Sequence, residues 1–484
     1  MKAIVANESK VDEFTIISEK PARLGEYVVA KTGDGDILGM VEETTITSAI
    51  MEDARDYMTA SEAERVASGN VRDRGYSSVV RVLGLVDSLK KGKAEMPSLP
   101  AEPGTPVDEA SEDLLKKIFS YGVEVGSLLR KRSVRVGVDL DAIASRHLAI
   151  LGATGSGKSN LLALIAKAVM NLGGTMIIFD YHGEYSSLKG SVLIRAKINP
   201  RVLDSDELAD LLEIRENASK QREVLTRALT NEVKASEDFW GALENNVHNE
   251  ARYPEVAERV IEIINGARRR NSRIFDTEIG DPVNMVKPNM VNVLDMSELT
   301  ESQSRLIIAY YAREILDQRK AFRHGERENI IFDTPVIIAV EEAHAFFPEG
   351  EDNEAQEIIS KIAREGRKFG VGLIVASQRP SRLSQDVLSQ MGSLAVFRIS
   401  QPRDQSYIVE SSELVSEEVA SGLPSLNSGE AVLLGQWVRL PTVAMIDLVE
   451  EKLVGSDIRA TNEWSMKKKL SGVAEERTDE MILR

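Results

Sequence analysis

The stretch that decides the fold reads Leu148-Ala149-Ile150-Leu151-Gly152-Ala153-Thr154-Gly155-Ser156-Gly157-Lys158-Ser159. Its first four residues are apolar and predict a short buried strand, and the apolar spacing from Ser159 to Leu172 predicts a helix. The residues between them match the phosphate-binding loop pattern, in which glycines let backbone N–H groups wrap phosphate oxygens. The N-terminus of the helix that follows also favours an anion.

The loop therefore predicts a site for ATP with Mg²⁺. The Lys158 ammonium is the positive charge expected at the β- and γ-phosphates, and the Ser159 hydroxyl is the expected ligand of Mg²⁺. A chance glycine-rich turn is disfavoured, because a strand precedes the loop and a helix follows it. The residues predicted to contact the nucleotide are Gly152, Ala153, Thr154, Gly155, Ser156, Gly157, Lys158, Ser159 and Asn160.

Two adjacent carboxylates, Glu341 and Glu342, follow the apolar stretch Val336–Val340. Ligands of open α/β sheets sit at the carboxyl ends of the strands, where this pair is expected. ATPases divide such carboxylates between the Mg²⁺ ion and the attacking water. We assign Glu341 to the metal and Glu342 to the water, although Asp is the usual metal-side residue. The alternative is a solvated pair at the start of a helix.

Two further residues are weaker candidates for catalysis. Asp180 ends an apolar strand and is placed to face the metal or the water, or alternatively to cap a turn. Gln378 follows the strand Leu373–Ala376 and is placed to hydrogen-bond a γ-phosphate or its water. We interpret His344 as structural, because the five histidines of the chain form no HxxH-like pair.

Strand-like and helical stretches alternate from Leu148 onward. This alternation predicts an α/β fold, a RecA-like P-loop ATPase core with a mainly parallel sheet. Charged amphipathic stretches such as Ser205–Ala218 and Pro254–Ala267 predict a helical insertion into that core. The later strands are predicted at Val291–Leu294, Val336–Val340, Leu373–Ala376, Leu394–Phe397, Ala431–Leu434 and Val443–Ile446.

The first part of the chain reads differently and predicts a small β-barrel. Four prolines within residues 91–110 predict an extended spacer after it. The expected strands are Phe14–Ile17, Tyr27–Ala30, Ile37–Val41, Thr44–Ile46 and Val79–Leu83, with a helix near Ser61–Ala67. The predicted domains are the barrel 1–90, the linker 91–110, the core 111–200 and 286–450, the insertion 201–285 and the tail 451–484.

Composition limits the class of protein. The 484 residues are 42% hydrophobic and 28% charged, as expected of a soluble protein of several domains. The absence of cysteine excludes disulfides and cysteine zinc sites. With no apolar run of membrane length and no signal-peptide pattern, we expect the cytoplasm. The net charge of −17 requires any DNA to meet a local basic surface.

One segment, residues 361–403, is locally basic. Lys361, Arg364 and Lys368 fall on one helix face. Three interpretations remain open: an arginine that reaches a neighbouring γ-phosphate, contacts with DNA phosphates, or a solvated face with local salt bridges. The basic residues of the segment are Lys361, Arg364, Arg367, Lys368, Arg379, Arg382, Arg398 and Arg403; Arg130-Lys131-Arg132 is a second cluster, for which the solvated face is again the alternative.

These motifs, in this order, resemble the HerA branch of the HerA/FtsK family of P-loop motors. The paired glutamate is itself typical of that branch, and the resemblance covers the motor core from about residue 140 to 450. The motifs that carry it are Gly152–Ser159, Phe179-Asp180-Tyr181-His182-Gly183-Glu184-Tyr185, Glu341-Glu342-Ala343-His344, Ala363-Arg364-Glu365-Gly366-Arg367-Lys368-Phe369-Gly370 and Ser377-Gln378-Arg379-Pro380.

The resemblance implies a hexameric ring that pumps double-stranded DNA through its channel, with a NurA-type nuclease docked on the barrel face, in the processing of double-strand-break ends. It implies that Lys158, Ser159 and Glu342 are catalytic and that Gln378 is a sensor. Arg367 resembles an arginine finger that acts in trans. Arg146 resembles a further arginine of the nucleotide site between subunits.

Two other classes share parts of the pattern. An ATP-dependent protein-remodelling ring would have the same loop and an arginine finger, but no second-sensor helical domain is recognisable after the core. A nucleotide-gated assembly switch would bind ATP, although the paired glutamates and Gln378 favour turnover. Pumps of the FtsK or conjugation type commonly carry membrane segments, which we do not find in this chain.

Overall fold

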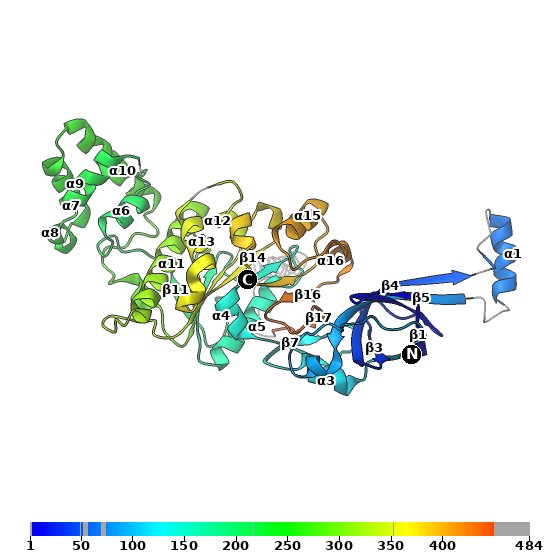
Figure 1. Cartoon of the computed structure of the whole chain (residues 1–484). Coiled ribbons are helices and arrows are strands. Elements are labelled where there is room, and N and C mark those ends of the chain that lie inside the picture. The colour runs from blue at the N-terminus through cyan, green and yellow to red at the C-terminus, as the bar shows by residue number, and fades with distance from the viewer. Residues whose placement is uncertain are drawn as a thin grey trace, which may run out of the picture.

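The computed structural model describes residues 2–48, 50–51, 57–68, 74–215, 217–351 and 353–449. An N-terminal barrel lies at one end of the molecule, an α/β core lies in the middle, and a group of helices lies at the other end (Figure 1). The predicted fold class is therefore confirmed. The loosely packed tail predicted for 451–484 lies outside the described residues.

The barrel closes in the strand order β1-β2-β5-β4-β3-β6. Its inner positions alternate along each strand, as the two-residue period of a strand requires: Ile16 is buried, whereas Ile17 is 52% exposed. The strands are β1 (Lys2–Ser9), β2 (Glu13–Ser18), β3 (Tyr27–Thr32), β4 (Gly35–Ser48), β5 (Arg74–Leu85) and β6 (Pro106–Glu109). The stretches predicted at Ile37–Val41 and Thr44–Ile46 form the single strand β4, and β1 was not predicted.

The prediction that residues 91–110 form a linker is wrong for its last residues, which form strand β6. Strand β6 pairs with β1 on one side and with β3 on the other, and so closes the barrel. Pro106 is the first residue of β6, a position where a strand tolerates the missing N–H. Prolines at this spacing favour an extended spacer, so they gave no sign of the strand that closes the barrel.

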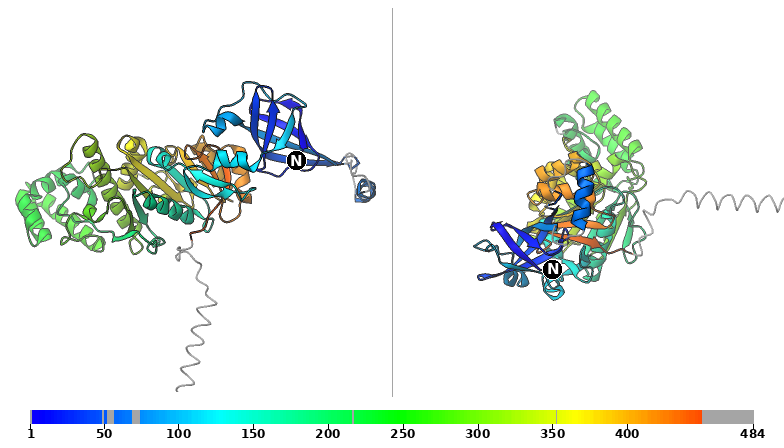
Figure 2. Two further views of the ribbon diagram at one scale, coloured as in Figure 1. Left: turned by 90° about the horizontal axis from the view of Figure 1, so that it is seen from below. Right: turned by 90° about the vertical axis from the view of Figure 1, so that its right-hand side faces the viewer.

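Strands β4 and β5 continue past the barrel as a two-stranded arm. Figures 1 and 2 show this arm projecting away from the rest of the chain, with helix α1 (Tyr57–Ser68) near its tip. The barrel packs on the core through the ring of Tyr27, whose centroid lies 5.1 Å from that of Phe119. The barrel is thus joined to the core by a shared apolar cluster.

The core is built on one sheet of eleven strands, in the order β11-β12-β10-β13-β14-β9-β15-β16-β17-β7-β8. Every pair from β11 to β15 is parallel, and every pair from β15 to β8 is antiparallel. The strands are β7 (Val123–Leu128), β8 (Arg135–Val138), β9 (Leu148–Leu151), β10 (Thr175–Asp180), β11 (Val192–Arg195), β12 (Val291–Asp295), β13 (Val336–Val340), β14 (Val371–Ser377), β15 (Ser393–Val396), β16 (Glu430–Gly435) and β17 (Thr442–Ile446).

The helices of the core begin and end at residues that the sequence marks. Helix α11 starts at a capping box of Thr300 and Gln303, and α13 starts where the Asn353 side chain accepts a hydrogen bond from the Gln356 N–H. The core and connecting helices are α2 (Val86–Lys90), α3 (Glu112–Phe119), α4 (Leu140–Arg146), α5 (Lys158–Asn171), α11 (Glu301–Arg323), α12 (Ala343–Phe346), α13 (Glu354–Phe369), α14 (Gln385–Leu388), α15 (Pro402–Ser411) and α16 (Glu417–Gly422), with short 3₁₀ turns at Pro380–Arg382 and Leu423–Ser425.

The helical insertion lies between β11 and β12, at the end of the molecule remote from the barrel (Figure 1). The helix predicted over Ser205–Ala218 ends earlier, at Leu211, and Glu213 takes a positive φ of 61° that no continuing helix allows. Its elements are α6 (Ser205–Leu211), α7 (Ser219–Ala228), α8 (Asn231–Ala235), α9 (Phe239–Glu250), α10 (Pro254–Arg270) and a 3₁₀ turn at Pro282–Met285.

The two isoleucines of β2 test the barrel. Ile16→Ala should lower the free energy of unfolding of the barrel by roughly 2–5 kcal/mol, because it leaves a cavity in a closed core. Ile17→Ala, on the same strand and of the same size, should change it by less than about 0.5 kcal/mol. Denaturant unfolding followed by circular dichroism measures both, and equal losses would contradict the inward placement of Ile16.

Candidate nucleotide-binding site

The phosphate-binding loop leaves the middle of the sheet, because β9 lies between β14 and β15. Gly152 and Gly157 have φ angles of 152° and 122°. A Cβ on Gly152 would lie 2.6 Å from the Phe397 Cβ, and one on Gly157 would lie 2.9 Å from the Phe397 ring. The Phe397 side chain therefore packs directly against the loop, and only glycine fits at these two positions.

Two neighbouring connections hold the loop in place. The Ala153 N–H donates to the Arg398 carbonyl at 2.9 Å, and the Gly429 N–H donates to the Ser156 carbonyl at 2.8 Å. The Ser428 hydroxyl donates to the Gly155 carbonyl at 2.9 Å. A Cβ on Gly155 would meet nothing within 4 Å, so the loop is fixed on one side and open on the other.

The residues present fit a nucleotide phosphate. The Lys158 side chain is only 9% exposed, and its Nζ donates to the Ala153 carbonyl at 3.2 Å, inside the curve of the loop. The Ser156 hydroxyl is buried, with no hydrogen-bond partner among the residues that the structure describes. A buried cation in a loop without side chains at its glycines is the donor set that a phosphate group requires.

Glu341 is buried directly after β13, next to the start of α5. The Tyr185 hydroxyl lies 2.5 Å from Glu341 Oε1 and 3.3 Å from the Ser159 carbonyl. Tyr185 thereby ties the proposed metal-side carboxylate to the residue whose hydroxyl is the other expected Mg²⁺ ligand. Tyr185 was not among the predicted site residues, and its place in the motif from Asp180 to Tyr185 is the one sequence signal that points to it.

Mg²⁺ fits these groups because it takes one or two protein ligands and completes its shell with water and phosphate. Within the described part of the chain, no group of three or more His, Cys, Asp or Glu side chains could by itself hold a metal ion. Ser159 and Glu341 are therefore suited to an ion that arrives with the nucleotide, and not to a metal bound by protein alone.

Glu342 occupies the left-handed region, with φ 47° and ψ 38°, at the turn from β13 into α12. A non-glycine residue held in this conformation costs about 1 kcal/mol or more and is typical of functional sites. Its carboxylate lies near Lys158 and accepts a hydrogen bond from Gln378. Burial is the main cause that raises the pKa of Glu342, and Lys158, His182 and Gln378 oppose this rise.

Gln378 connects the two halves of the site. Its side-chain oxygen accepts a hydrogen bond from the Thr154 hydroxyl, while its amide group reaches Glu342. It follows β14, whose last residue Ser377 pairs with Leu151 at the start of the phosphate-binding loop. Thr154, Gln378 and Glu342 thus form one chain of contacts, and the sensor role of Gln378 stays a prediction.

His344, which we interpreted as structural, lies beside Glu342 and Ser377. Its Nδ1 lies 3.3 Å from Glu342 Oε2 and 3.2 Å from the Ser377 hydroxyl. Burial, followed by the charges of Arg379 and Arg382, lowers the pKa of His344 to about 4. The lowered pKa favours the neutral imidazole, which faces the Glu342 carboxylate without adding a charge beside it.

Two predicted site residues have structural roles. The carboxylate of Asp180 accepts hydrogen bonds from the N–H groups of Glu184 and Tyr185, each at 2.9 Å. Asp180 therefore caps the turn that positions Tyr185, so the predicted catalytic role is not supported. The Asn160 amide bonds the Asp447 carbonyl at 2.6 Å and the Val449 N–H at 2.9 Å. Its amide is engaged by that backbone, and a nucleotide contact is not supported.

Arg146 and Arg367 lie at the opposite edge of the sheet. Arg146 is the last residue of α4, directly before β9, and Arg367 is an exposed residue in the last turn of α13, just before β14. β14 has seven residues, so at about 3.3 Å per residue roughly 20 Å separate its two ends. Neither arginine is brought to the phosphate-binding loop of its own chain.

The basic residues fall into separate groups. Arg130 donates a hydrogen bond to the Leu24 carbonyl, and Lys131 donates one to the Ala110 carbonyl. These contacts join the barrel to the core, which is a structural role. The α13 residues Lys361, Arg364, Arg367 and Lys368 are exposed. Three arginines of the later connections line a cleft of about 480 Å³ with His344, namely Arg379, Arg382 and Arg403.

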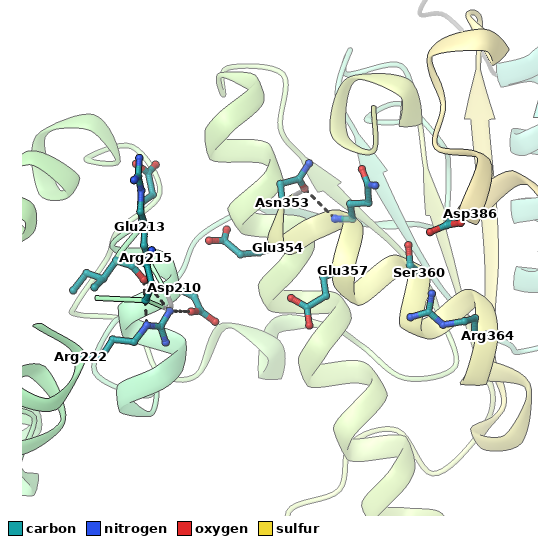
Figure 3. A pocket seen from close by; sticks show the side chains of 13 residues that line it. Asp210, Glu213, Arg215, Arg222, Asn353, Glu354, Glu357, Ser360, Arg364 and Asp386 are labelled. Atoms are coloured by element: carbon teal, nitrogen blue, oxygen red, sulfur yellow. Dashed lines mark hydrogen bonds and ion pairs between the residues drawn. The ribbon is translucent and has the colours of Figure 1, made fainter. Parts of the chain in front are cut away.

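A wider cleft of about 790 Å³ separates the insertion from α13. Figure 3 shows Arg222 and Asp210 on the insertion side, and Glu357 and Arg364 on the core side. Burial and the nearby charges of Asp210 and Glu213 raise the pKa of Glu354 in this cleft to about 7. Because both signs of charge line its walls, the cleft does not form a continuous basic surface.

Comparison with known proteins gives the family. Residues 123–315 match the family described as the central domain of helicase HerA. The DNA double-strand break repair helicase HerA of Sulfolobus acidocaldarius is 36% identical over 96% of each chain. The chain belongs to the HerA family. The HerA of Pyrococcus furiosus is 33% identical over 94% of this chain and 95% of its own.

Solved structures support the fold of this HerA-family chain. VirB4 of Thermoanaerobacter pseudethanolicus matches with a TM-score of 0.50 at 18% identity, over 69% of this chain and 98% of its own. The bacterial conjugative coupling protein TrwBdeltaN70 matches with a TM-score of 0.50 at 14% identity, over 71% and 93%. Within the described residues of the HerA-family chain, no helix is both long and apolar enough to cross a membrane.

Gly157→Ala tests the fit of the loop. The added Cβ would press on the Phe397 ring at a φ of 122°, so we expect nucleotide affinity to fall by at least about tenfold. Gly173→Ala is the matched control, since Gly173 follows the same helix at φ 66° with nothing within 4 Å of its Cβ position. Titration with a fluorescent ATP analogue measures the affinity of both variants. Unchanged affinity in Gly157→Ala would contradict the close packing of Gly157 against the Phe397 ring.

Proposed function

We propose that this protein is a hexameric, ATP-driven translocase of double-stranded DNA that acts with a NurA-type nuclease in end resection during double-strand-break repair. The observation that supports it best is the division of the nucleotide site between two edges of one sheet. Lys158, Glu342 and Gln378 lie at one edge, and two arginines lie at the other. A complete site then requires a second copy of the chain.

The chemistry assigned to this chain follows from the contacts of Glu342. Residues 152–159 hold the triphosphate, and Ser159 and Glu341 hold Mg²⁺, which supplies positive charge to the phosphates. Glu342 orients the attacking water and accepts its proton at the carboxylate, a role for which burial beside a neutral His344 is suited. Gln378 links this carboxylate to Thr154 and so reports whether the loop is filled.

The ring follows from repeating one contact. A surface that carries arginines and a different surface that carries the phosphate-binding loop make a head-to-tail interface, which closes into a ring when the rotation per subunit allows. Arg367 then stabilises negative charge on the phosphates held by the next copy. Six subunits are proposed from the resemblance to HerA proteins, whose names state helicase activity in repair.

DNA is proposed to meet local basic surfaces, because the whole chain carries a net charge of −17. Arg379, Arg382 and Arg403 are the candidates, since they share a cleft with His344, which lies beside Glu342. Glu301, Glu349 and Glu351 line the same cleft, so the proposed contact is with the individual arginines and not with a continuous basic surface. Contacts with backbone phosphates would be independent of base sequence and would weaken as salt rises. The nuclease is placed on the barrel side by family resemblance.

The decisive experiment is steady-state ATPase activity with and without linear duplex DNA. Wild-type activity should rise with DNA, and Glu342→Gln should lower the stimulated rate by at least about 100-fold, because it removes the proton acceptor. Nucleotide binding should persist, and Glu357→Gln, an exposed glutamate of α13, should behave as wild type. Hydrolysis by wild type that ignores DNA would instead favour a protein-remodelling ring or an assembly switch.

Mixed rings test the divided site. Lys158→Ala and Arg367→Ala should each abolish most activity alone, since one lacks the phosphate charge and the other the arginine offered to its neighbour. Rings that contain both variants hold some interfaces with an intact Lys158 opposite an intact Arg367, so activity should reappear. Co-expression with two different tags isolates such rings, and no recovery would count against arginine action in trans.

A further inference from the structure

A buried histidine outside the nucleotide site occupies a backbone conformation normally reserved for glycine. His147 has φ 64° and ψ 162°, and its side chain is 1% exposed. This region of backbone space is essentially closed to residues with a Cβ, and strain kept there marks a position that the surrounding structure holds for a purpose. His147 lies outside the motifs of the nucleotide site and has no part in the proposed hydrolysis.

Both ring nitrogens of His147 are engaged by backbone. Nε2 lies 3.1 Å from the Ala363 carbonyl in α13, and Nδ1 lies 3.0 Å from the Leu373 N–H in β14. A carbonyl accepts and an N–H donates, so only the neutral tautomer with the proton on Nε2 satisfies both. Burial lowers the pKa of His147 to about 4, which keeps that tautomer in place at neutral pH.

The place of His147 in the chain connects the two arginines. Arg146 precedes it at the end of α4, and Ala363 stands four residues, about one helical turn, before Arg367 in α13. The Arg146 carbonyl is held in turn by the Gly392 N–H at 2.7 Å. A single imidazole thus joins the end of α4 to the last turns of α13, at the sheet edge remote from the phosphate-binding loop.

The end of α13 is fixed from its other side as well. The buried Arg319 donates to the Phe369 carbonyl at 2.8 Å and to the Phe332 carbonyl at 3.0 Å. A Cβ on Gly372 would lie 2.7 Å from the Ala144 Cα, so α4 rests directly on β14. With these contacts in place, a shift of α4 relative to α13 requires the His147 bridge to break.

We propose that His147 is a positioning residue that holds α4 and α13 together so that Arg146 and Arg367 are presented jointly to the nucleotide site of the next copy. This role rests on the proposed function, because it requires the arginines to act in trans. His147 touches neither nucleotide nor water. It acts through the two helices, and its strained backbone is the consequence of turning from α4 into β9 while its ring faces α13.

His147→Gly separates this role from stability, because glycine relieves the backbone strain while the bridge is lost. We expect a folded ring whose DNA-stimulated kcat is about 10- to 100-fold lower, as misplacement of a catalytic group by about an ångström predicts. His147→Asn keeps one donor and one acceptor and bears the same backbone strain as His147, so it should recover part of the rate. Asn329 is exposed and has a φ of 58°, so Asn329→Gly is the control for placing glycine at a positive φ.

Mixed rings then assign the defect to one side of the interface. His147→Gly subunits keep an intact Lys158 and Glu342, so pairing them with Lys158→Ala should restore activity, and pairing them with Arg367→Ala should not. The double variant His147→Gly/Arg367→Ala should be no slower than Arg367→Ala alone. The opposite pairing pattern, or a wild-type rate in His147→Gly, would overturn the role of His147.

The Lys158→Ala and Arg367→Ala pair serves as the reference. If that pair fails to recover activity, the divided site itself is wrong and the role of His147 falls with it. If that pair recovers but His147→Gly is rescued only by Arg367→Ala, the residue acts within its own site through β9. In that case the proposed function stands and only the inference about His147 is lost. If His147→Gly does not fold, the same pairings are read with His147→Asn.

Discussion

The rest of the structure depends on the parallel register of β9 between β14 and β15. Parallel strands bring their carboxyl ends to one edge, so the residues that follow β9, β13 and β14 meet there although nearly 230 positions separate the first from the last in sequence. That one constraint puts Thr154 against Gln378 and Glu342 beside Lys158. Phe397, which follows β15, supports the glycines of the loop from the same edge.

The same register sends the opposite ends of these strands to the other edge, where α4 and α13 lead into β9 and β14. The phosphate-binding loop thus lies at one edge and Arg146 and Arg367 lie at the other, which is why we propose that a second copy of the chain completes the site. The His147 bridge and the Arg319 contacts make the second edge as well defined as the first. The proposed ring would need both edges to be rigid, because a small displacement of a catalytic group strongly lowers a reaction rate.

Local sequence was sufficient wherever a motif had one chemical meaning. The glycines, Lys158 and Ser159 predicted the loop, and the apolar run before Glu341 placed the carboxylate pair at the end of a buried strand. Prolines had two meanings, since Pro106 is the first residue of the strand that closes the barrel and not part of a spacer. Asp180 and Asn160 show a second ambiguity: short polar side chains beside a site also serve as caps and anchors, and only their partners distinguish the two uses.

The sequence by itself determined the class of the protein, the position of its phosphate-binding loop and the place of Glu341 and Glu342 after a buried strand, because these depend on residue type and local spacing. Only the tertiary structure decided that Tyr185 ties Glu341 to Ser159, that His344 touches Glu342, and that His147 bridges the arginine-bearing helices. Each of these contacts joins residues brought together by strand pairing and helix packing. Such non-local geometry leaves no periodic or compositional signal in a single chain.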